Sequence, residues 1–308
     1  MTSAATPPGD DFVLPFRVGP AALRGRLVRL GPAIDRILSE RRYPEPVASL
    51  LAEAVTLATL LAKSLKYEGI FTLQTKGDGP LRLLVADVSS EGALRGYARY
   101  DEGALAKALL GADAEAPVPR LLGRGVIAFT VDQGERGERY QRLVELSGAT
   151  LAECAQHYFR QSEQLQAGLK LAAGRPRPQA PWRAGGLMLQ RLPPEGGFAA
   201  IADDLEDAWR RAMVLMSSAS SAELIDPDLP AESLLFRLFH EDGVRVYRTH
   251  RLLARCRCSR RKIEEVLKSF SQETLGEMRD EGAATITCEF CNARYIFDKI
   301  DLDRLIAA

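Results

Sequence analysis

Residues 47–65 carry the strongest apolar periodicity in the chain. Apolar side chains recur there at spacings of three and four residues, at Leu50, Leu51, Ala54, Leu57, Ala58 and Leu61. This spacing predicts a helix with one face in a hydrophobic core. Glu53, Thr56 and Thr59 interrupt the apolar run, which also falls short of the roughly 20 residues that a membrane-spanning helix needs. The pattern therefore predicts a core helix and no membrane association.

Around this helix the pattern is mostly that of short strands. Apolar segments bounded by Gly, Pro, Ser or Asp occupy residues 12–14, 24–30, 70–75, 81–88, 93–100, 125–131, 140–146 and 184–190. Short turns join several of them, so neighbouring strands are expected to be antiparallel. Shorter helical patterns cover residues 34–38, 103–110 and 150–162. Together these elements predict an α+β fold, with an antiparallel sheet and helices, for an N-terminal domain of residues 1–198.

Residues 199–253 show a mainly helical pattern. Acidic residues followed by an apolar stripe that includes Trp209 and Met213 predict a helix over residues 199–217. A second apolar cluster consists of Leu234, Leu235, Phe236, Leu238 and Phe239. We interpret the segment as a helical linker rather than an independent domain.

Residues 254–308 are predicted to form a small C-terminal domain. Ser259 and Ser271 can each cap a short helix, and Gly282 can end the second one. Residues 284–288 and 293–297 predict a β-hairpin, and residues 298–308 a closing helix. A domain of about 55 residues buries little apolar surface, so it is expected to need a metal for stability.

Four of the five cysteines lie in this domain, in two close pairs, Cys256-x-Cys258 and Cys288-x-x-Cys291. The second spacing is typical of a zinc knuckle, and two pairs complete a tetrahedral four-cysteine site for one Zn²⁺. Such a site has no open position for a substrate, which indicates structure or switching rather than metal catalysis. A disulfide between residues i and i+2 closes a strained ring, and strained disulfides are the labile, regulatory ones. The fifth cysteine, Cys154, is interpreted as a buried apolar side chain.

Composition and charge argue against several classes of protein, though not against a local basic patch. The chain has 308 residues, of which 46% are apolar, and its 41 Lys and Arg equal its 41 Asp and Glu. This balance argues against a dedicated nucleic-acid or membrane binder. The first ten residues lack the features of a signal peptide, so a cytoplasmic location is expected.

No residue pattern indicates an enzyme. His157, His240 and His250, the only histidines, have no companions for a hydrolase or metalloprotease arrangement. There is no P-loop, and Gly77-x-Gly79 lies between two predicted strands rather than before a helix, which argues against a nucleotide site.

The cysteine segments resemble the zinc domain of the redox-regulated heat-shock chaperones, the 33-kilodalton chaperonin family. The segments that carry this resemblance are Cys256-Arg257-Cys258-Ser259, Cys288-Glu289-Phe290-Cys291-Asn292 and Tyr295-x-Phe297-Asp298. Segments around Gly69, Gly77, Gly79 and Gly96, residues 158–165 and residues 184–190 resemble the family's N-terminal domain. We expect those glycines to supply the positive φ that tight turns need.

The resemblance implies an ATP-independent holdase that is silent when reduced and zinc-bound. It implies that Cys256, Cys258, Cys288 and Cys291 bind Zn²⁺ and that oxidation forms the disulfides Cys256–Cys258 and Cys288–Cys291. Unfolding of the zinc domain and of residues 199–253 would then expose apolar surface to unfolded or partly folded client proteins. A homodimer of the oxidised protein is also implied. We expect the client surface to include Leu234, Leu235, Phe236, Leu238 and Phe239.

Two other interpretations remain open. Arg251, Arg255, Arg257, Arg260, Arg261 and Lys262 surround the first cysteine pair with no acidic residue among them. They can stabilise thiolates or form a solvated basic face. Alternatively, they can form the nucleic-acid contact surface of a zinc-ribbon protein. An enzyme with a purely structural zinc is the remaining alternative.

Overall fold

The computed structural model describes residues 9–19, 23–110, 116–134, 137–162, 166–191 and 202–306. The chain divides into two compact units, Met1–Ala254 and Arg255–Ala308. The predicted α+β class is confirmed, and each unit has its own hydrophobic core.

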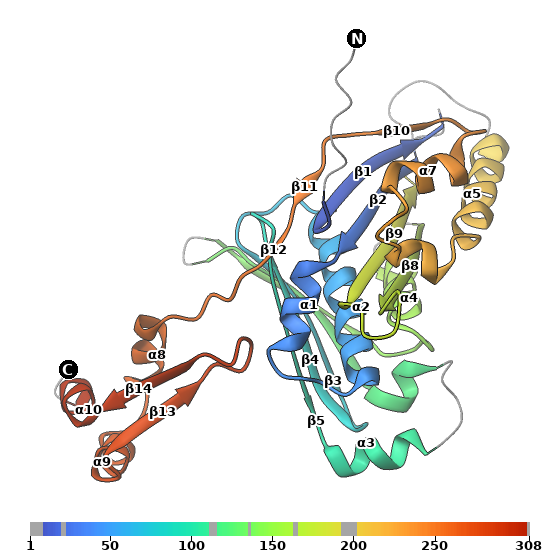
Figure 1. Ribbon diagram of the computed structural model, residues 1–308. Helices are drawn as coiled ribbons and strands as arrows, with labels where there is room; N and C mark the ends of the chain where they lie inside the picture. The colour runs from blue at the N-terminus through green and yellow to red at the C-terminus, as the bar shows by residue number, and fades with distance from the viewer. Residues whose placement is uncertain are drawn as a thin grey trace. The chain divides into compact units, whose positions relative to one another are not determined.

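Two sheets form the framework of the first unit (Figure 1). The first sheet has the strand order β10 (Val244–Val246), β1 (Phe12–Val18), β2 (Leu23–Leu30), β9 (Arg183–Arg191) and β8 (Ala167–Gly174), and β11 (His250–Arg251) also pairs with β1. The second sheet has the order β12 (Leu253–Ala254), β5 (Ala93–Tyr100), β4 (Leu81–Ser89), β3 (Ile70–Gly77), β6 (Gly125–Asp132) and β7 (Arg139–Glu145). The predicted antiparallel pairing of β3, β4 and β5 and of β6 with β7 is confirmed. Strand β8 was absent from the sequence prediction.

Helix α2 (Glu45–Ala62) contacts strands of both sheets, as its apolar periodicity predicts (Figure 1). The hydroxyls of Thr56 and Thr59 donate to the carbonyl oxygens of Ala52 and Val55 at 2.9 and 2.7 Å, so these two polar side chains are satisfied within the core. Among the described helices, α2 alone is long and apolar enough to cross a membrane, but 78% of that stretch is buried inside the protein. Burial in the core accounts for its apolar composition.

Glu53 is the one acidic side chain near the middle of α2, and it forms no hydrogen bond or ion pair with a described residue. Burial raises the pKa of its carboxyl to about 7. The folded protein therefore holds this proton more tightly than the unfolded chain, so stability falls as the pH rises from about 4.5 to about 7. We expect Glu53→Gln to stabilise the protein by about 1–3 kcal/mol at pH 8. Each unit of pKa shift corresponds to about 1.4 kcal/mol, and partial exposure of Glu53 to solvent lowers the cost of ionising it in the folded protein. Urea unfolding at pH 8 and at pH 5 measures this, and an equal gain at both pH values would contradict it.

The glycine expectation is correct at Gly69, where φ is +122°, and wrong at Gly77, Gly79 and Gly96, whose φ values are not positive. Close approach explains these three glycines instead. A Cβ at Gly79 would lie 2.5 Å from the Leu121 carbonyl oxygen, and one at Gly96 would lie 3.0 Å from a Val55 methyl on α2. The backbone that approaches Gly79 belongs to the π-helical turn Val118–Leu122. The sequence pattern did not predict this turn.

Shorter helices complete the core around α2. They are α1 (Pro32–Ser39), α3 (Glu102–Leu109) and α4 (Leu151–Ser162), close to the predicted ranges. The Cys154 side chain on α4 is fully buried, and burial raises the pKa of its thiol to about 11. This confirms its interpretation as an apolar core residue.

Helices α5 (Ala202–Ser217), α6 (Ser221–Ile225) and α7 (Ala231–Phe239) cover the second face of the first sheet (Figure 1). Alternate residues of β1 face different cores: Val13 belongs to the core around α2, whereas Phe12, Leu14 and Phe16 belong to the core under these helices. The Phe16 and Phe239 rings stack with centroids 5.9 Å apart. After α7 the chain is extended and adds β10, β11 and β12 to the sheets. The start of the predicted helix, residues 199–201, lies outside the described residues, as do residues 163–165.

The second unit is a β-hairpin with three short helices. Its elements are α8 (Arg260–Leu267), α9 (Gln272–Asp280), β13 (Ala283–Thr287), β14 (Arg294–Asp298) and α10 (Lys299–Ile306). The Ser259 and Ser271 hydroxyls accept hydrogen bonds from the backbone N–H groups of Lys262 and Thr274, which confirms both predicted caps. Five buried side chains form its apolar core: Leu267, Leu275, Ala284, Phe297 and Leu302. So small a core leaves the unit dependent on another source of stability.

Candidate metal centre

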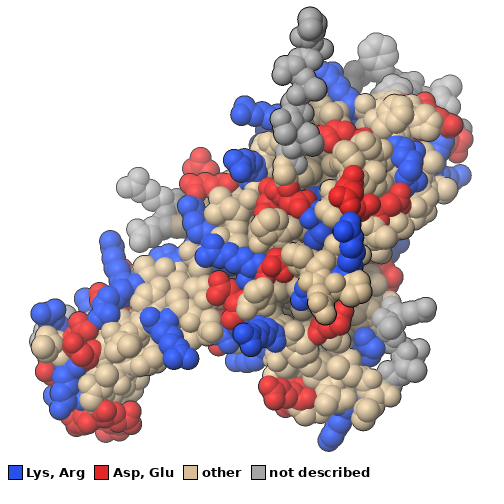
Figure 2. Space-filling view, viewed as in Figure 1, with Lys and Arg blue, Asp and Glu red and all other residues tan. Residues whose placement is uncertain are grey.

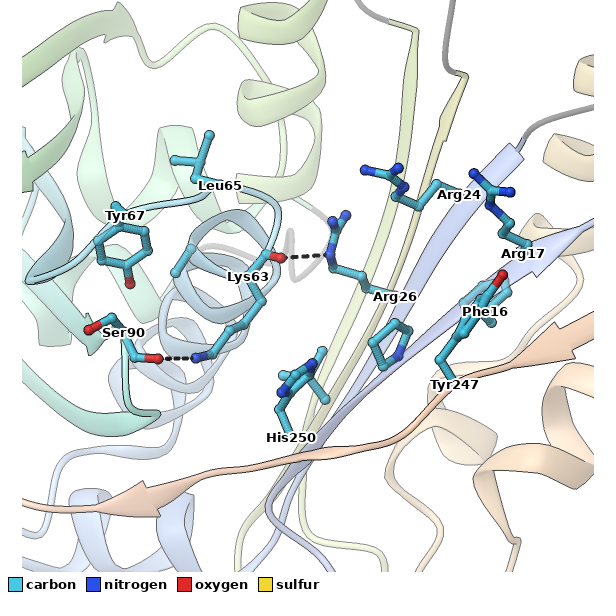
Figure 3. Close-up of a pocket in the computed structure, with 13 residues that line it drawn as sticks. Phe16, Arg17, Arg24, Arg26, Lys63, Leu65, Tyr67, Ser90, Tyr247 and His250 are labelled. Atoms are coloured by element: carbon cyan, nitrogen blue, oxygen red, sulfur yellow. Dashed lines mark hydrogen bonds between the residues drawn. The ribbon is translucent and has the colours of Figure 1, made fainter. Parts of the chain in front are cut away.

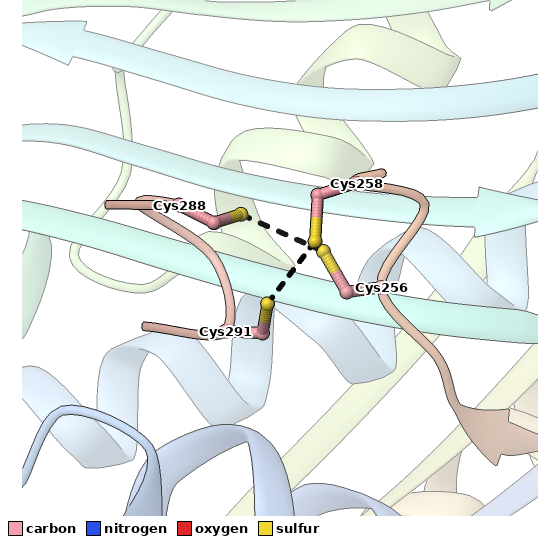
Figure 4. Close-up of side chains that lie close together, drawn as sticks. All are labelled: Cys256, Cys258, Cys288 and Cys291. Carbon is pink, nitrogen blue, oxygen red and sulfur yellow. Dashed lines mark hydrogen bonds between the residues drawn. The ribbon is translucent and has the colours of Figure 1, made fainter. Parts of the chain in front are cut away.

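The two cysteine pairs converge in the second unit (Figure 4). The four Sγ atoms all lie within 4.8 Å of one another. The Sγ atoms of Cys256 and Cys288 are 3.7 Å apart, and those of Cys258 and Cys291 are 3.4 Å apart. A tetrahedral ion with metal–sulfur bonds of about 2.3 Å requires sulfur–sulfur separations of about 3.8 Å. The four thiols therefore fit a metal ion of that size.

Local backbone structure positions each pair. Cys256 and Cys258 lie in the segment that leads into α8, which begins directly after its cap Ser259. Cys288 and Cys291 lie in the turn between β13 and β14. There the Cys288 N–H donates to the Ala293 carbonyl, and the Asn292 N–H donates to the Cys288 carbonyl, each at 2.9 Å. Asn292 adopts φ +57°, which asparagine tolerates well. The tight turn aims both sulfurs toward the first pair.

Four thiols this close cannot all ionise without a cation, because thiolates repel one another. Burial opposes ionisation of Cys256, but hydrogen bonds from the Cys258 backbone and the other thiols outweigh it and lower its pKa to about 7. Burial raises the pKa of Cys258 and Cys291. A divalent cation would favour ionisation of all four thiols.

Tyr295 on β14 is a neighbour of this cluster that the residue patterns did not assign to the site. Its hydroxyl donates to the Cys258 Sγ at 3.1 Å, and this hydrogen bond, followed by burial, raises the tyrosine pKa to about 12. Only the hairpin register, which pairs Tyr295 with Ile286, brings the hydroxyl to the sulfur.

The sequence matches the Hsp33 protein family over residues 11–298. The chain belongs to the Hsp33 family. The 33 kDa chaperonin of Caulobacter vibrioides (strain NA1000 / CB15N) is 42% identical over 303 residues, which cover 97% of this chain and 99% of that protein. The 33 kDa chaperonin of Ectopseudomonas mendocina (strain ymp) is 38% identical over 300 residues, which cover 97% and 96% of the two chains.

The Hsp33 fold is also seen in a crystal structure of the 33 kDa chaperonin from Thermotoga maritima. The two structures align with a TM-score of 0.79 at 22% identity, over 96% of this chain and 98% of the other. The predicted family and fold are therefore confirmed. The Hsp33 relatives are named as chaperonins, which agrees with the expectation of a protein that is not an enzyme.

The basic residues beside the Hsp33 cysteine cluster are largely engaged. Arg260 pairs with Asp301 and Glu264 and stacks over the Phe297 ring at 4.3 Å, and Arg261 pairs with Glu265. Arg255 and Arg257 also have interaction partners. Blue and red side chains are interspersed on the face that Figure 2 shows. These pairs reduce the positive charge that a nucleic-acid interface would need.

The structure divides the expected client surface into two kinds of side chain. Leu234, Leu235, Leu238 and Phe239 are buried between α7 and the first sheet, whereas Phe236 is 63% exposed. Four of the five side chains can thus meet a client only after α7 leaves the sheet. The three histidines lie on α4, after α7 and on β11, and none belongs to the cysteine cluster.

Proposed function

We propose that the protein is an ATP-independent holdase that oxidation of its cysteine cluster activates. The convergence of four thiols at metal-binding distances, in a unit with a five-residue core, supports this proposal most strongly. Membership of a chaperone family supports the general class. We assign the protein to the cytoplasm, where thiols stay reduced in the absence of stress.

In the reduced protein, Cys256, Cys258, Cys288 and Cys291 would hold one Zn²⁺ as thiolates. The ion supplies cross-linking between the two cysteine segments, and a structural zinc site contributes on the order of 10 kcal/mol to folding. The four ligands close the site, so it serves stability and sensing rather than catalysis.

Oxidation converts the four thiolates to two disulfides. Two molecules of hydrogen peroxide accept four electrons and four protons and leave as four molecules of water, while the sulfurs form Cys256–Cys258 and Cys288–Cys291. The cluster then has no thiolate left to bind the metal. The second unit loses the cross-link that its small core needs, and it unfolds.

Residues 199–253 act as the linker between the sensing unit and the N-terminal domain, residues 1–198, and unfold with residues 254–308. Strand β12 ends at Ala254, one residue before the second unit begins. Departure of this linker would expose Leu234, Leu235, Leu238 and Phe239 beside Phe236. This apolar surface would bind unfolded or partly folded client proteins, with the oxidised protein acting as a homodimer.

The test follows zinc, thiols and chaperone activity together during oxidation by peroxide with mild heat. We expect one zinc to leave as four thiols disappear, and suppression of client aggregation to appear at the same time. Zinc that stays bound, or leaves without any gain of activity, would contradict the switch. The alternative of a zinc-ribbon nucleic-acid binder predicts salt-dependent DNA or RNA binding by the reduced protein, which we do not expect because Arg260 and Arg261 are paired.

Tyr295→Phe is expected to weaken zinc binding by the reduced protein roughly 10-fold, because partners hydrogen-bonded to metal ligands typically contribute about 10- to 100-fold in affinity. The substitution removes only the hydroxyl that donates to Cys258 Sγ. Competition with a chromogenic chelator measures the affinity. Tyr247→Phe, which removes an exposed hydroxyl in the first unit, is the control. Equal zinc affinities in the two variants would show that the hydrogen bond is dispensable.

A further inference from the structure

The first unit contains a cavity of about 570 Å³ beside the C-terminal end of α2 (Figure 3). Strands β1 and β2 form one wall, and the segment from β10 to β11 crosses its edge. Five of the lining residues carry basic side chains: Arg17, Arg24, Arg26, Lys63 and His250. None of the lining residues is acidic, and no described carboxylate forms an ion pair with any of the five. The cavity is therefore a site of concentrated positive charge without a counter-ion from the described residues.

The strand register forces three of these cations together. Arg17 lies directly opposite Arg24 in the β1–β2 pair, and Arg26 lies two residues further on the same face as Arg24. Like charges directly opposite each other destabilise a sheet. The arrangement thus costs stability unless an anion lies between the side chains.

Arg26 is the most buried of the group, at 7% exposure. Its Nε donates to the Lys63 carbonyl at 2.9 Å and its Nη1 to Gln190 Oε1 at 3.0 Å. Burial, and then repulsion by Arg24, lower its pKa to about 10. Contact with the Lys63 carbonyl at the C-terminal end of α2 gives Arg26 a structural role, since cations are favoured at a helix C-terminus.

The other four basic side chains have no carboxylate partner among the described residues. Lys63 Nζ donates to the Ser90 carbonyl at 2.7 Å, which is a neutral acceptor. His250 lies near three positive charges: burial, and then Lys63, Arg248 and Arg26, lower its pKa. A multivalent anion in the cavity would offset the repulsion among these positive charges.

We propose that this cavity binds a small multivalent oxyanion of phosphate chemistry, held by Arg17, Arg24, Arg26 and Lys63. Arginine forks and a lysine ammonium are the side chains that recognise phosphate oxygens. Tyr247 and His250 complete the cavity from residues 244–251, whose strands pair with β1 through Val246 and His250. A bound anion therefore ties this segment to the first sheet. If the proposed function holds, the same anion would slow activation, because residues 244–251 belong to the linker that must leave the first sheet when the chaperone is activated.

The test uses the reduced, zinc-loaded full chain and inorganic pyrophosphate at low ionic strength. Calorimetry is expected to show one site per chain. The double variant Arg17→Gln/Arg24→Gln is expected to bind roughly tenfold more weakly or worse, because it removes two of the four cations that would hold the anion. Lys63→Gln provides an independent variant. Arg99→Gln, which removes an exposed arginine from β5, is the matched control and should bind normally.

Hydrogen exchange tests the second part of the proposal. At a pyrophosphate concentration about 100 times the Kd, opening of residues 244–251 should become roughly 100-fold rarer in the wild-type protein. Absence of binding, or equal binding by the double variant and Arg99→Gln, overturns the site. Unchanged exchange at saturation overturns the tie to the linker.

ADP, measured in parallel, identifies which ligand the site recognises. An affinity equal to that of pyrophosphate shows that the site recognises the phosphate groups alone, and tighter binding shows that it recognises a nucleotide. Neither measurement requires oxidation, so failure here is distinct from failure of the chaperone switch.

Discussion

Replacing Cys288 by serine is expected to abolish tight zinc binding and to unfold residues 255–308, while the core around α2 stays folded. Cys288 Sγ lies 3.7 Å from Cys256 Sγ in the cluster, and a hydroxyl is a poor substitute for a thiolate ligand. Loss of the site removes stabilisation on the order of 10 kcal/mol from a unit with five buried apolar side chains. The core around α2 is separate from the core of residues 255–308, so it stays intact when those residues unfold.

Zinc content by elemental analysis and the dispersion of amide signals from residues 255–306 measure this outcome. Cys154→Ala is the matched control, because it also removes one thiol but from a fully buried position on α4. That variant should keep one zinc per chain and a folded second unit. A Cys288→Ser protein that retains wild-type zinc affinity would refute the four-cysteine site.

Phe239→Ala is expected to destabilise the packing of α5–α7 on the first sheet by about 3–5 kcal/mol, the usual cost of removing a buried phenylalanine. The Phe239 ring is fully buried and stacks on Phe16. Loss of this contact leaves a cavity between α7 and β1. If residues 199–253 are the linker, the variant should also suppress client aggregation at lower oxidant concentration than the wild type.

Phe236→Ala provides the comparison on the same helix. Its ring is 63% exposed and contacts His240, so its removal should change stability by less than about 0.5 kcal/mol. If Phe236 contacts clients, this variant should bind them more weakly after oxidation while its reduced form stays normal. Urea unfolding of both reduced variants separates the two roles. Equal losses of stability in the two variants would show that burial of the Phe239 side chain does not govern the docking of α7.

Several expectations that depended on local pattern are reproduced by the structure. The periodicity around Leu57 predicted α2, and the serine caps at Ser259 and Ser271 predicted the starts of α8 and α9. The cysteine spacing predicted which residues converge, because two close cysteine pairs are the usual ligand pattern of a four-cysteine zinc site. Local chemistry was sufficient in each case.

Strand β8 shows where local pattern fails. Its sequence, AGLKLAAG, contains small residues with weak strand preference. It is a strand because β9 pairs with it along its whole length and because α4, α5 and α6 cover it. Gly168 illustrates the close packing, since a Cβ there would lie 2.3 Å from the Met213 sulfur. Pairing and cover come from other elements before and after β8 in the chain, so the sequence of the strand itself does not contain them.

The sequence by itself thus determined the family, through motifs spread along the chain, and the two cysteine pairs. It also determined most of the helices and strands, since each of these depends on residues within one turn or one strand. Tertiary structure decided which members of a local pattern share an environment. It separated Phe236 from Phe239 on one helix, brought the Tyr295 hydroxyl to Cys258, and gathered Arg17, Arg24 and Lys63 around one cavity. Burial, hydrogen bonding and uncompensated charge depend on neighbours that are far away in the chain, so only the folded protein sets them.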